Sequence, residues 1–172
     1  GGGNGGNGNG CMAEGAATSA PLMNLLKAST DAQLEQSLRE FVRIRTVSSN
    51  PALREECLRG ARFVSQLLEG LGAQVKVVCP LEDKNPVVLG RLGAGGDKPT
   101  VTLYGHYDVQ PANEPDWATD PFELNAVNEY LYGRGTSDNK GPILAFIYAV
   151  KELLAGLSLQ GGQGGCAAAA GA

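Results

Sequence analysis

Apolar side chains recur at helical spacing in two stretches of the first half of the chain. Residues 34–44 have the period of an amphipathic helix, and residues 30–33 (TDAQ) have the spacing of a capping box before it. The second stretch begins at Asn50-Pro51, a favourable N-cap followed by proline in the first turn, and Gly72 is suited to ending it. Its apolar stripe consists of Leu53, Cys57, Ala61, Val64, Leu68 and Leu71.

Short apolar segments rich in β-branched residues follow the second helix. Each is bounded by glycine, proline or polar residues, which is typical of strands. Three of them are Ala73–Cys79, Pro86–Leu92 and Thr100–Tyr104. A weaker strand at Phe122–Val127 is expected to pair with Tyr130–Tyr132 across a turn at Asn128-Glu129.

A third helix is expected from about Gly141 to Ala155. Apolar residues cover most of its circumference, which predicts that it is buried. Helices mixed with short apolar strands predict an α/β layered domain, here residues 25–155. The chain starts with Gly rather than Met, and nothing after Ala155 has the pattern of a further strand or helix. We therefore expect the N-terminal part of a larger domain.

Both ends of the chain have low complexity. Of the 25 glycines among 172 residues, eight fall in residues 1–15 and six in residues 156–172. We expect residues 1–24 to be a Gly-rich linker and residues 156–172 a low-complexity tail, because neither offers enough apolar surface to order itself.

Charge and cysteine content narrow the classes of partner. The net charge of −4, with scattered basic residues, argues against nucleic acid. The longest apolar run, residues 142–150, is too short to span a bilayer, so no membrane partner is expected.

The four cysteines form no C-x-x-C pair, and no signal peptide is evident, which together favour a reduced, cytoplasmic protein. Cys57 and Cys79 are expected in the core.

Candidate chemistry gathers in two segments. His106 and Asp108 lie two residues apart at the end of the expected strand 100–104, on one face if the strand continues. The carboxyl ends of strands are where open α/β sheets bind ligands. Asp138 lies among glycines just before the third helix, in a loop suited to holding a carboxylate. Because His106 is the only histidine, a self-contained site with two histidine ligands is excluded.

Charge leaves two interpretations of this region open. From Asp108 to Asp138 inclusive there are seven acidic residues and one basic residue, a pattern that favours a divalent cation but is on charge alone more often that of a solvated loop. A lone histidine in a strand is likewise more often structural than a metal ligand. The chain has no complete dinucleotide fingerprint, Walker motif or G-x-S-x-G elbow.

Taken together, these segments resemble the M20 family of metallopeptidases. The resemblance is carried by GHYDVQP at 105–111, WATDPF at 117–122 and YLYGRGTSDNKGP at 130–142, with REFVRIRTVSSNP at 39–51. It runs from about Leu34 to Leu154 and is strongest to the cytosolic dipeptidases. These include carnosine and Cys-Gly dipeptidases and the M20 subunit of the glutathione degradosome.

The resemblance implies a fold, an activity and roles for the site residues. The fold would be a truncated three-layer M20 zinc-peptidase catalytic domain with a central mixed sheet and without its lid domain. The activity would be hydrolysis of small peptides with two divalent metal ions, zinc or else manganese. His106 would bind one metal, Asp138 would bridge both, and Asp108 would act in catalysis by orienting His106. The Asp138–Asn139 peptide would be cis, and full-length relatives would form homodimers or complexes.

The same resemblance shows what this sequence lacks. The family's adjacent glutamates and its second histidine ligand would follow the third helix, where residues 161–172 contain no acid and no histidine. We therefore expect an incomplete and inactive fragment. Two alternatives stay open: a non-catalytic M20-like binding subunit of a peptidase complex, and a misassembled gene model with a spurious tail.

Overall fold

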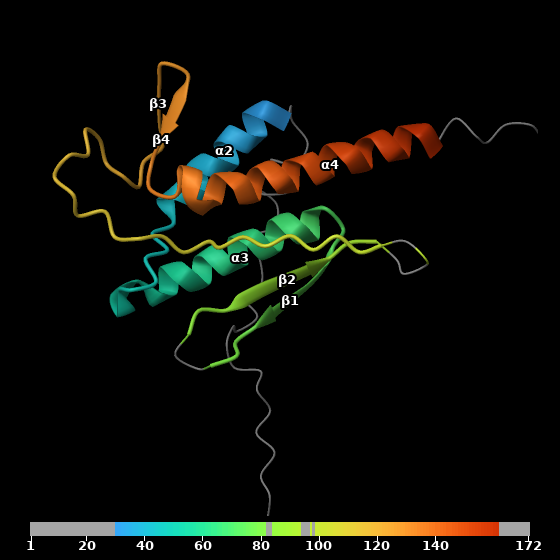
Figure 1. The fold of residues 1–172 in the computed structure, drawn as a ribbon, viewed down its shortest axis with the longest axis horizontal. Helices are drawn as coiled ribbons and strands as arrows, with labels where there is room; N and C mark the ends of the chain where they lie inside the picture. The colour runs from blue at the N-terminus through green and yellow to red at the C-terminus, as the bar shows by residue number, and fades with distance from the viewer. Residues whose placement is uncertain (1–29, 82–83, 94–96, 98, 162–172) are drawn as a thin grey trace, which may run out of the picture.

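The computed structural model describes residues 30–81, 84–93, 97 and 99–161, and the side chains of 158–161 are not described. Three long helices, two short hairpins and two short helical turns make up this part of the chain (Figure 1). The helices are α2 (Thr30–Arg43), α3 (Arg54–Gly70) and α4 (Gly141–Gly161), and the turns are η1 (Pro51–Leu53) and η2 (Thr136–Lys140). The strands are β1 (Gln74–Val78), β2 (Val87–Arg91), β3 (Asn125–Val127) and β4 (Tyr130–Tyr132).

The expected start and stop of the second helix are confirmed. Helix α2 covers Thr30–Arg43, and because the described residues begin at Thr30, the capping box predicted at residues 30–33 stays a prediction. Before α3, the Asn50 side chain accepts a hydrogen bond from the Ala52 amide at 3.1 Å, and the first turn after it is the 3₁₀ turn η1. Gly72 follows α3 with a φ of +84°, the left-handed conformation that ends a helix.

Two antiparallel hairpins account for the strands. β1 pairs with β2 from Gln74 opposite Arg91 to Val78 opposite Val87. Figure 1 shows this hairpin beside α3, on the side away from α4. The β3–β4 hairpin turns at Asn128 and Glu129, which both have positive φ, as a tight hairpin turn requires. The α/β class is confirmed, with helices and strands in one packed unit.

The expected strand Thr100–Tyr104 is not formed. The segment belongs to no sheet, and Val101 and Tyr104 are 79% and 91% exposed. A strand needs a neighbour to pair its backbone groups, and the described residues supply none beside it. They therefore contain two separate two-stranded sheets and not the central mixed sheet that the resemblance implied.

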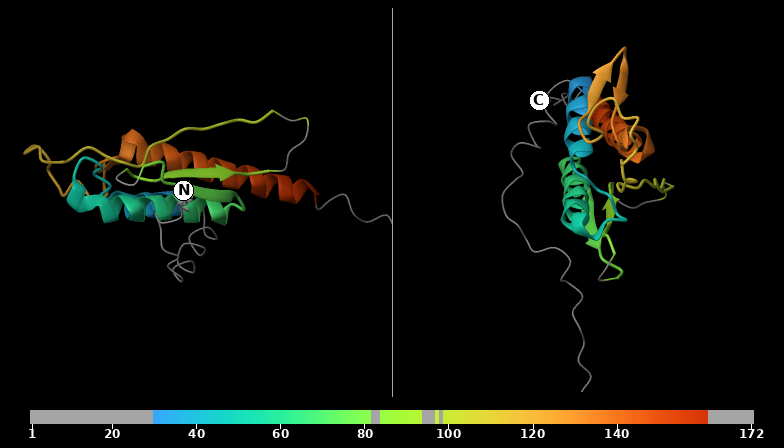
Figure 2. Two further views of the ribbon diagram at one scale, coloured as in Figure 1. Left: turned by 90° about the horizontal axis from the view of Figure 1, so that it is seen from below. Right: turned by 90° about the vertical axis from the view of Figure 1, so that its left-hand side faces the viewer.

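The core lies between the three helices. Side chains of α2, α3 and α4 form one buried cluster in which the rings of Phe41 and Phe63 lie 4.9 Å apart. Helix α4 packs on α2, where the buried Tyr148 hydroxyl lies 2.8 Å from Ser37 Oγ. Figure 2 shows α3 and α4 extending along the same long dimension of the molecule.

The prediction that the third helix is buried all round is wrong in the described residues. Leu144 and Ile147 face the core, whereas Leu153 and Leu157 are 62% and 56% exposed. The reason is that no described element covers the second face of α4. The helix also continues to Gly161, past the expected end at Ala155.

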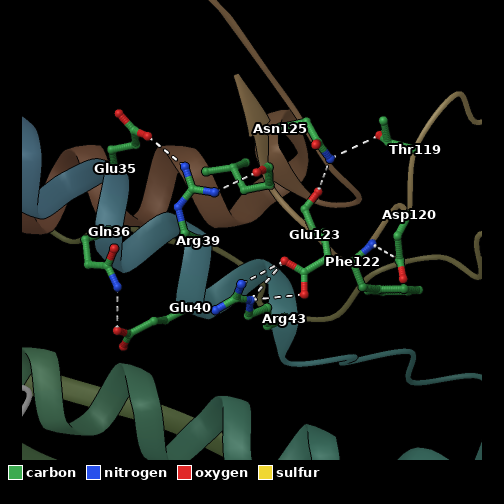
Figure 3. A network of polar contacts seen from close by, with 11 residues as sticks. Glu35, Gln36, Arg39, Glu40, Arg43, Thr119, Asp120, Phe122, Glu123 and Asn125 are labelled. Carbon is green, nitrogen blue, oxygen red and sulfur yellow. Dashed lines mark hydrogen bonds and ion pairs between the residues drawn. The ribbon is translucent and has the colours of Figure 1, made fainter. Parts of the chain in front are cut away.

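Polar contacts hold the segment before β3 against α2. Arg39 donates to the backbone carbonyl of Leu124 at 2.8 Å. Arg43 donates to the Glu123 carboxylate at 2.9–3.2 Å, and Figure 3 shows these two side chains facing each other. The Arg43–Glu123 pair is about half exposed, so it fixes the position of the segment more than it stabilises the fold.

The two central cysteines differ from each other. Cys57 is a free thiol and 1% exposed, as expected of a core residue. Cys79 is half-buried and disulfide-bonded, so the expectation of a reduced core cysteine is wrong there.

Among the described residues no helix combines the length and apolar character that a membrane span requires.

Candidate metal-binding site

The three residues singled out in the sequence lie together. His106 Nε2 is 2.8 Å from Asp138 Oδ1, and His106 Nδ1 is 3.2 Å from both Asp108 Oδ1 and the Asp108 backbone carbonyl. Residues 32 positions apart in the chain thus meet at one imidazole ring. The site is open, because the side chains of His106 and Asp138 are 37% and 85% exposed.

Asp138 is presented by the turn η2 at the start of α4. The turn is preceded by Gly135, which has a φ of +88°. A Cβ at Gly135 would lie 2.7 Å from Val109 Cγ1, so the turn and the segment after His106 pack without room for a side chain. The Asp138–Asn139 peptide is cis, as the resemblance implied.

Gly105 brings the other half of the site equally close. A Cβ there would meet Ile143 Cγ1 at 2.6 Å and Asn139 Oδ1 at 3.0 Å. The backbone before His106 therefore lies directly against the beginning of α4. Glycine at this position allows the imidazole to reach Asp138.

Ser48 is a site residue that the sequence reasoning missed. Its hydroxyl donates to Asp108 Oδ2 at 2.7 Å, so the Asp108 carboxylate is held by Ser48 on one oxygen and by His106 on the other. Thr46 supports the same segment, since its hydroxyl donates to the Tyr107 carbonyl at 2.5 Å and its own carbonyl accepts from the Val109 amide. The sequence signal for Ser48 is the segment 39–51, which contains it and which carries part of the family resemblance.

The hydrogen-bond partners determine the tautomer of His106. Asp108 presents only acceptors to Nδ1, so Nδ1 carries a hydrogen. In the neutral ring, the lone pair of Nε2 then points at the Asp138 carboxylate. Because Asp138 Oδ1 is also an acceptor, a hydrogen on Nε2 makes the 2.8 Å contact a hydrogen bond, and a metal ion bound at Nε2 would take the place of that hydrogen.

The electrostatics of the apo site agree with this geometry. Burial lowers the pKa of His106, but the hydrogen bond to Asp138 and the contacts with Asp108 outweigh it, so the pKa is raised above 6.5. Nearby, burial lowers the pKa of Lys140 to about 7.

The other acidic residues of the region do not converge on this site. Glu114 pairs with Arg134 at 2.8 Å and accepts from Trp117, Asp120 accepts from the Phe122 amide, and Glu123 pairs with Arg43. These carboxylates form local ion pairs and hydrogen bonds, which supports the solvated-loop interpretation for these residues. Among the described acidic residues, Asp108 and Asp138 are the two that contact the imidazole.

The donors present fit one part of a metal site. An imidazole nitrogen and a carboxylate oxygen aimed at the same point are a suitable donor pair for a divalent ion such as zinc. In the described part of the chain, however, no group of three or more His, Cys, Asp or Glu side chains could hold a metal. His106 and Asp138 therefore form an incomplete donor set.

Comparison with known proteins agrees with the resemblance drawn from the motifs. Residues 102–162 match the model of "Peptidase family M20/M25/M40". The chain is 42% identical over 132 residues to the Beta-Ala-His dipeptidase of Rattus norvegicus and 38% identical over 130 residues to the Cys-Gly metallodipeptidase DUG1 of Candida albicans. These alignments cover 70% and 67% of this chain.

The fold leads to the same family. The crystal structure of human carnosine dipeptidase 1 matches with a TM-score of 0.66 and 38% identity, over 79% of this chain and 32% of that one. Sequence and fold are thus both similar to those of peptidases of family M20/M25/M40. The two curated relatives are named as dipeptidases, and the chain spans 27% of the length of each.

Proposed function

We propose that this chain supplies one side of the metal centre of an M20-type dipeptidase, which hydrolyses peptide bonds of small peptides. His106 and Asp138 would hold the metal, Asp138 would be shared between two ions, and Asp108 orients His106. The observation that carries the proposal is the 2.8 Å contact between His106 Nε2 and Asp138 Oδ1. Zinc is the favoured metal for such a mixed donor pair, and manganese is the alternative.

The roles of the protein residues follow from their contacts. Asp108 accepts the Nδ1 hydrogen, which keeps the Nε2 lone pair free and increases its basicity. Ser48 holds Asp108 in place at 2.7 Å. When bound, divalent ions would supply a Lewis acid and a water of lowered pKa. Asp138, as a carboxylate with two oxygens, has the capacity to bind two ions at once.

We further propose that the 172-residue chain is inactive by itself. A catalytic zinc site commonly has three protein ligands, and the described residues bring together two. They also place no further carboxylate at the imidazole to act as a general base, a function worth roughly 10²–10⁴-fold in rate.

Zinc binding tests the ligand assignment. Isothermal titration calorimetry of the purified chain should show weak binding that Asp138→Asn reduces strongly. Asp116→Asn is the matched control, because Asp116 is an exposed aspartate of the same acidic region. Equal zinc affinity in Asp138→Asn and in the wild-type chain would remove Asp138 from the site.

Peptide hydrolysis tests the proposed activity. With zinc or manganese, the chain alone should not cleave beta-Ala-His or Cys-Gly. A longer product of the same gene that contains the missing donors should cleave one of them. Turnover by the 172-residue chain would overturn its inactivity, and failure of the longer product on all small peptides would overturn the dipeptidase assignment.

A non-catalytic binding subunit is the second candidate function. It is favoured by the exposed apolar side chains of Val101, Leu103 and Tyr104 in an unpaired extended segment. Co-expression with a full-length M20 dipeptidase, followed by size-exclusion chromatography, separates the two. A stable complex in which the chain changes the partner's activity without turnover of its own would favour this candidate.

A further inference from the structure

Lys140 is a buried amino group that the proposed chemistry does not use. Its side chain is 0% exposed, and its Nζ donates to the backbone carbonyls of Phe41 at 2.8 Å and Ile44 at 2.7 Å. It also lies 4.9 Å from the centre of the Phe41 ring. In the described residues it pairs with no carboxylate, so backbone carbonyls are its polar partners. A charged or a neutral amine can donate both of these hydrogen bonds.

These carbonyls lie at the C-terminal end of α2. The last carbonyls of a helix have no partner within the helix, and they carry the negative end of its dipole. Helix α2 ends at Arg43, and Lys140 contacts carbonyls on either side of that end. Lys140 therefore serves as a C-terminal cap delivered from a distant segment.

The other end of Lys140 closes the turn that carries Asp138. The Lys140 amide donates to the Gly135 carbonyl at 2.9 Å, and its Cδ lies 3.3 Å from where a Gly135 Cβ would be. The backbone of η2 and the end of α2 are thus connected through one side chain. Asp138 lies inside this turn, two residues before Lys140.

The segment that receives Lys140 also holds the other half of the site. Residues 41–48 contact Lys140 through the Phe41 and Ile44 carbonyls, and they contact the segment 107–109 through Thr46, the Val47–Val109 bridge and Ser48. Both halves are therefore positioned against one short stretch of chain. Loss of the Lys140 contacts would release Asp138 while the Ser48–Asp108–His106 contacts remain.

We propose that Lys140 is a positioning residue, which anchors η2 to the end of α2 and thereby holds Asp138 against the imidazole of His106. The metal-related part of this inference rests on the proposed function. Its geometric part, the His106–Asp138 contact, does not depend on any metal.

The test reads the contact directly by NMR. Because His106 is the only histidine, its imidazole signals in the full 172-residue chain report the contact without assignment ambiguity. The reference is Asp138→Asn, which removes the carboxylate charge. We expect metal-free Lys140→Met to shift the His106 signals toward those of Asp138→Asn. His106 signals that stay at the wild-type position in a folded Lys140→Met chain would overturn the proposal.

A matched destabilising variant separates positioning from stability. Leu67 is 0% exposed in α3 and does not contact the site, so Leu67→Ala should lower stability and leave the His106 signals unchanged. Zinc affinity should fall roughly 10–100-fold in Lys140→Met and by less than about twofold in folded Leu67→Ala. Equal losses in the two variants would make Lys140 merely structural.

The conservative variant covers the case in which Lys140→Met does not fold. Lys140→Arg restores a long side chain with N–H donors, and we expect it to recover both stability and the wild-type His106 signals. Recovered stability with His106 signals still at the Asp138→Asn position would overturn the proposal. Absence of zinc binding in the wild-type chain would count against the proposed function alone, because the metal-free NMR comparison would still decide the role of Lys140.

Discussion

Gly135 and Gly72 form a matched pair for testing how tightly the two halves of the site are packed. Both glycines have a left-handed backbone, with φ of +88° and +84°. At Gly135 an added Cβ would lie 2.7 Å from Val109 Cγ1 and 3.3 Å from Lys140 Cδ. At Gly72 nothing lies within 4 Å.

The expected magnitudes follow from these surroundings. Alanine in a left-handed conformation costs about 1–2 kcal/mol, and this cost is common to both positions. The effect of alanine on the unfolded chain is also similar at both and cancels in the comparison. Gly135→Ala adds a steric overlap with Val109, and overpacking of this kind costs about 1–3 kcal/mol. Gly135→Ala should therefore lower the free energy of unfolding by about 1–3 kcal/mol more than Gly72→Ala.

Urea unfolding followed by circular dichroism measures both variants against the wild-type chain. Equal m-values would show that the difference in midpoint reports stability. If both variants lose the same free energy, the contact between Gly135 and Val109 is looser than described. Close packing at Gly135 would then not be what holds the η2 turn against the His106 segment.

Three further outcomes test the contacts around the site and the core. Ser48→Ala removes a donor to Asp108 and should weaken zinc binding roughly 10–100-fold in a chelator competition, whereas unchanged affinity would exclude a positioning role. Burial lowers the pKa of His106, but Asp138 and Asp108 outweigh it and raise the pKa above 6.5. In the metal-free chain the contacts of His106 therefore stabilise the fold fully below pH 6.5, and this stabilisation is lost as the pH rises through the raised pKa. An NMR titration giving a pKa of 6.5 or lower contradicts this. Tyr148→Phe leaves the buried Ser37 hydroxyl without its partner and should cost about 1–3 kcal/mol in unfolding experiments. The double variant with Ser37→Ala should lose less than the sum of the single variants, and strict additivity would refute the contact.

The sequence predicted those features that depend on neighbouring residues. Helix periodicity, the Asn50 cap, the glycine at 72 and the tight hairpin turn at 128–129 are all local choices of backbone conformation, and all were confirmed. The motifs indicated the same family as the comparisons for the same reason, because they are contiguous strings of residues. Local pattern also placed His106 and Asp138 as candidates for one site.

Features that depend on distant partners could not be predicted in this way. The segment 100–104 has a strand's composition, but forming a strand requires a neighbouring chain, which the described residues do not provide. Helix α4 is apolar on nearly every side, yet burial is decided by what packs against it, and the described residues cover one face of the helix. Composition likewise gave no indication that Cys79 is disulfide-bonded.

The tertiary structure alone decided how the candidate site is held. Sequence spacing placed Asp108 beside His106, but it could not show that Ser48 holds Asp108 or that Lys140 reaches the end of α2. Lys140 and Phe41 are 99 residues apart, and their contact exists only because the core brings α2 against α4. Local conformation is encoded in short stretches of sequence, whereas the geometry of this site depends on packing between segments far apart in the chain.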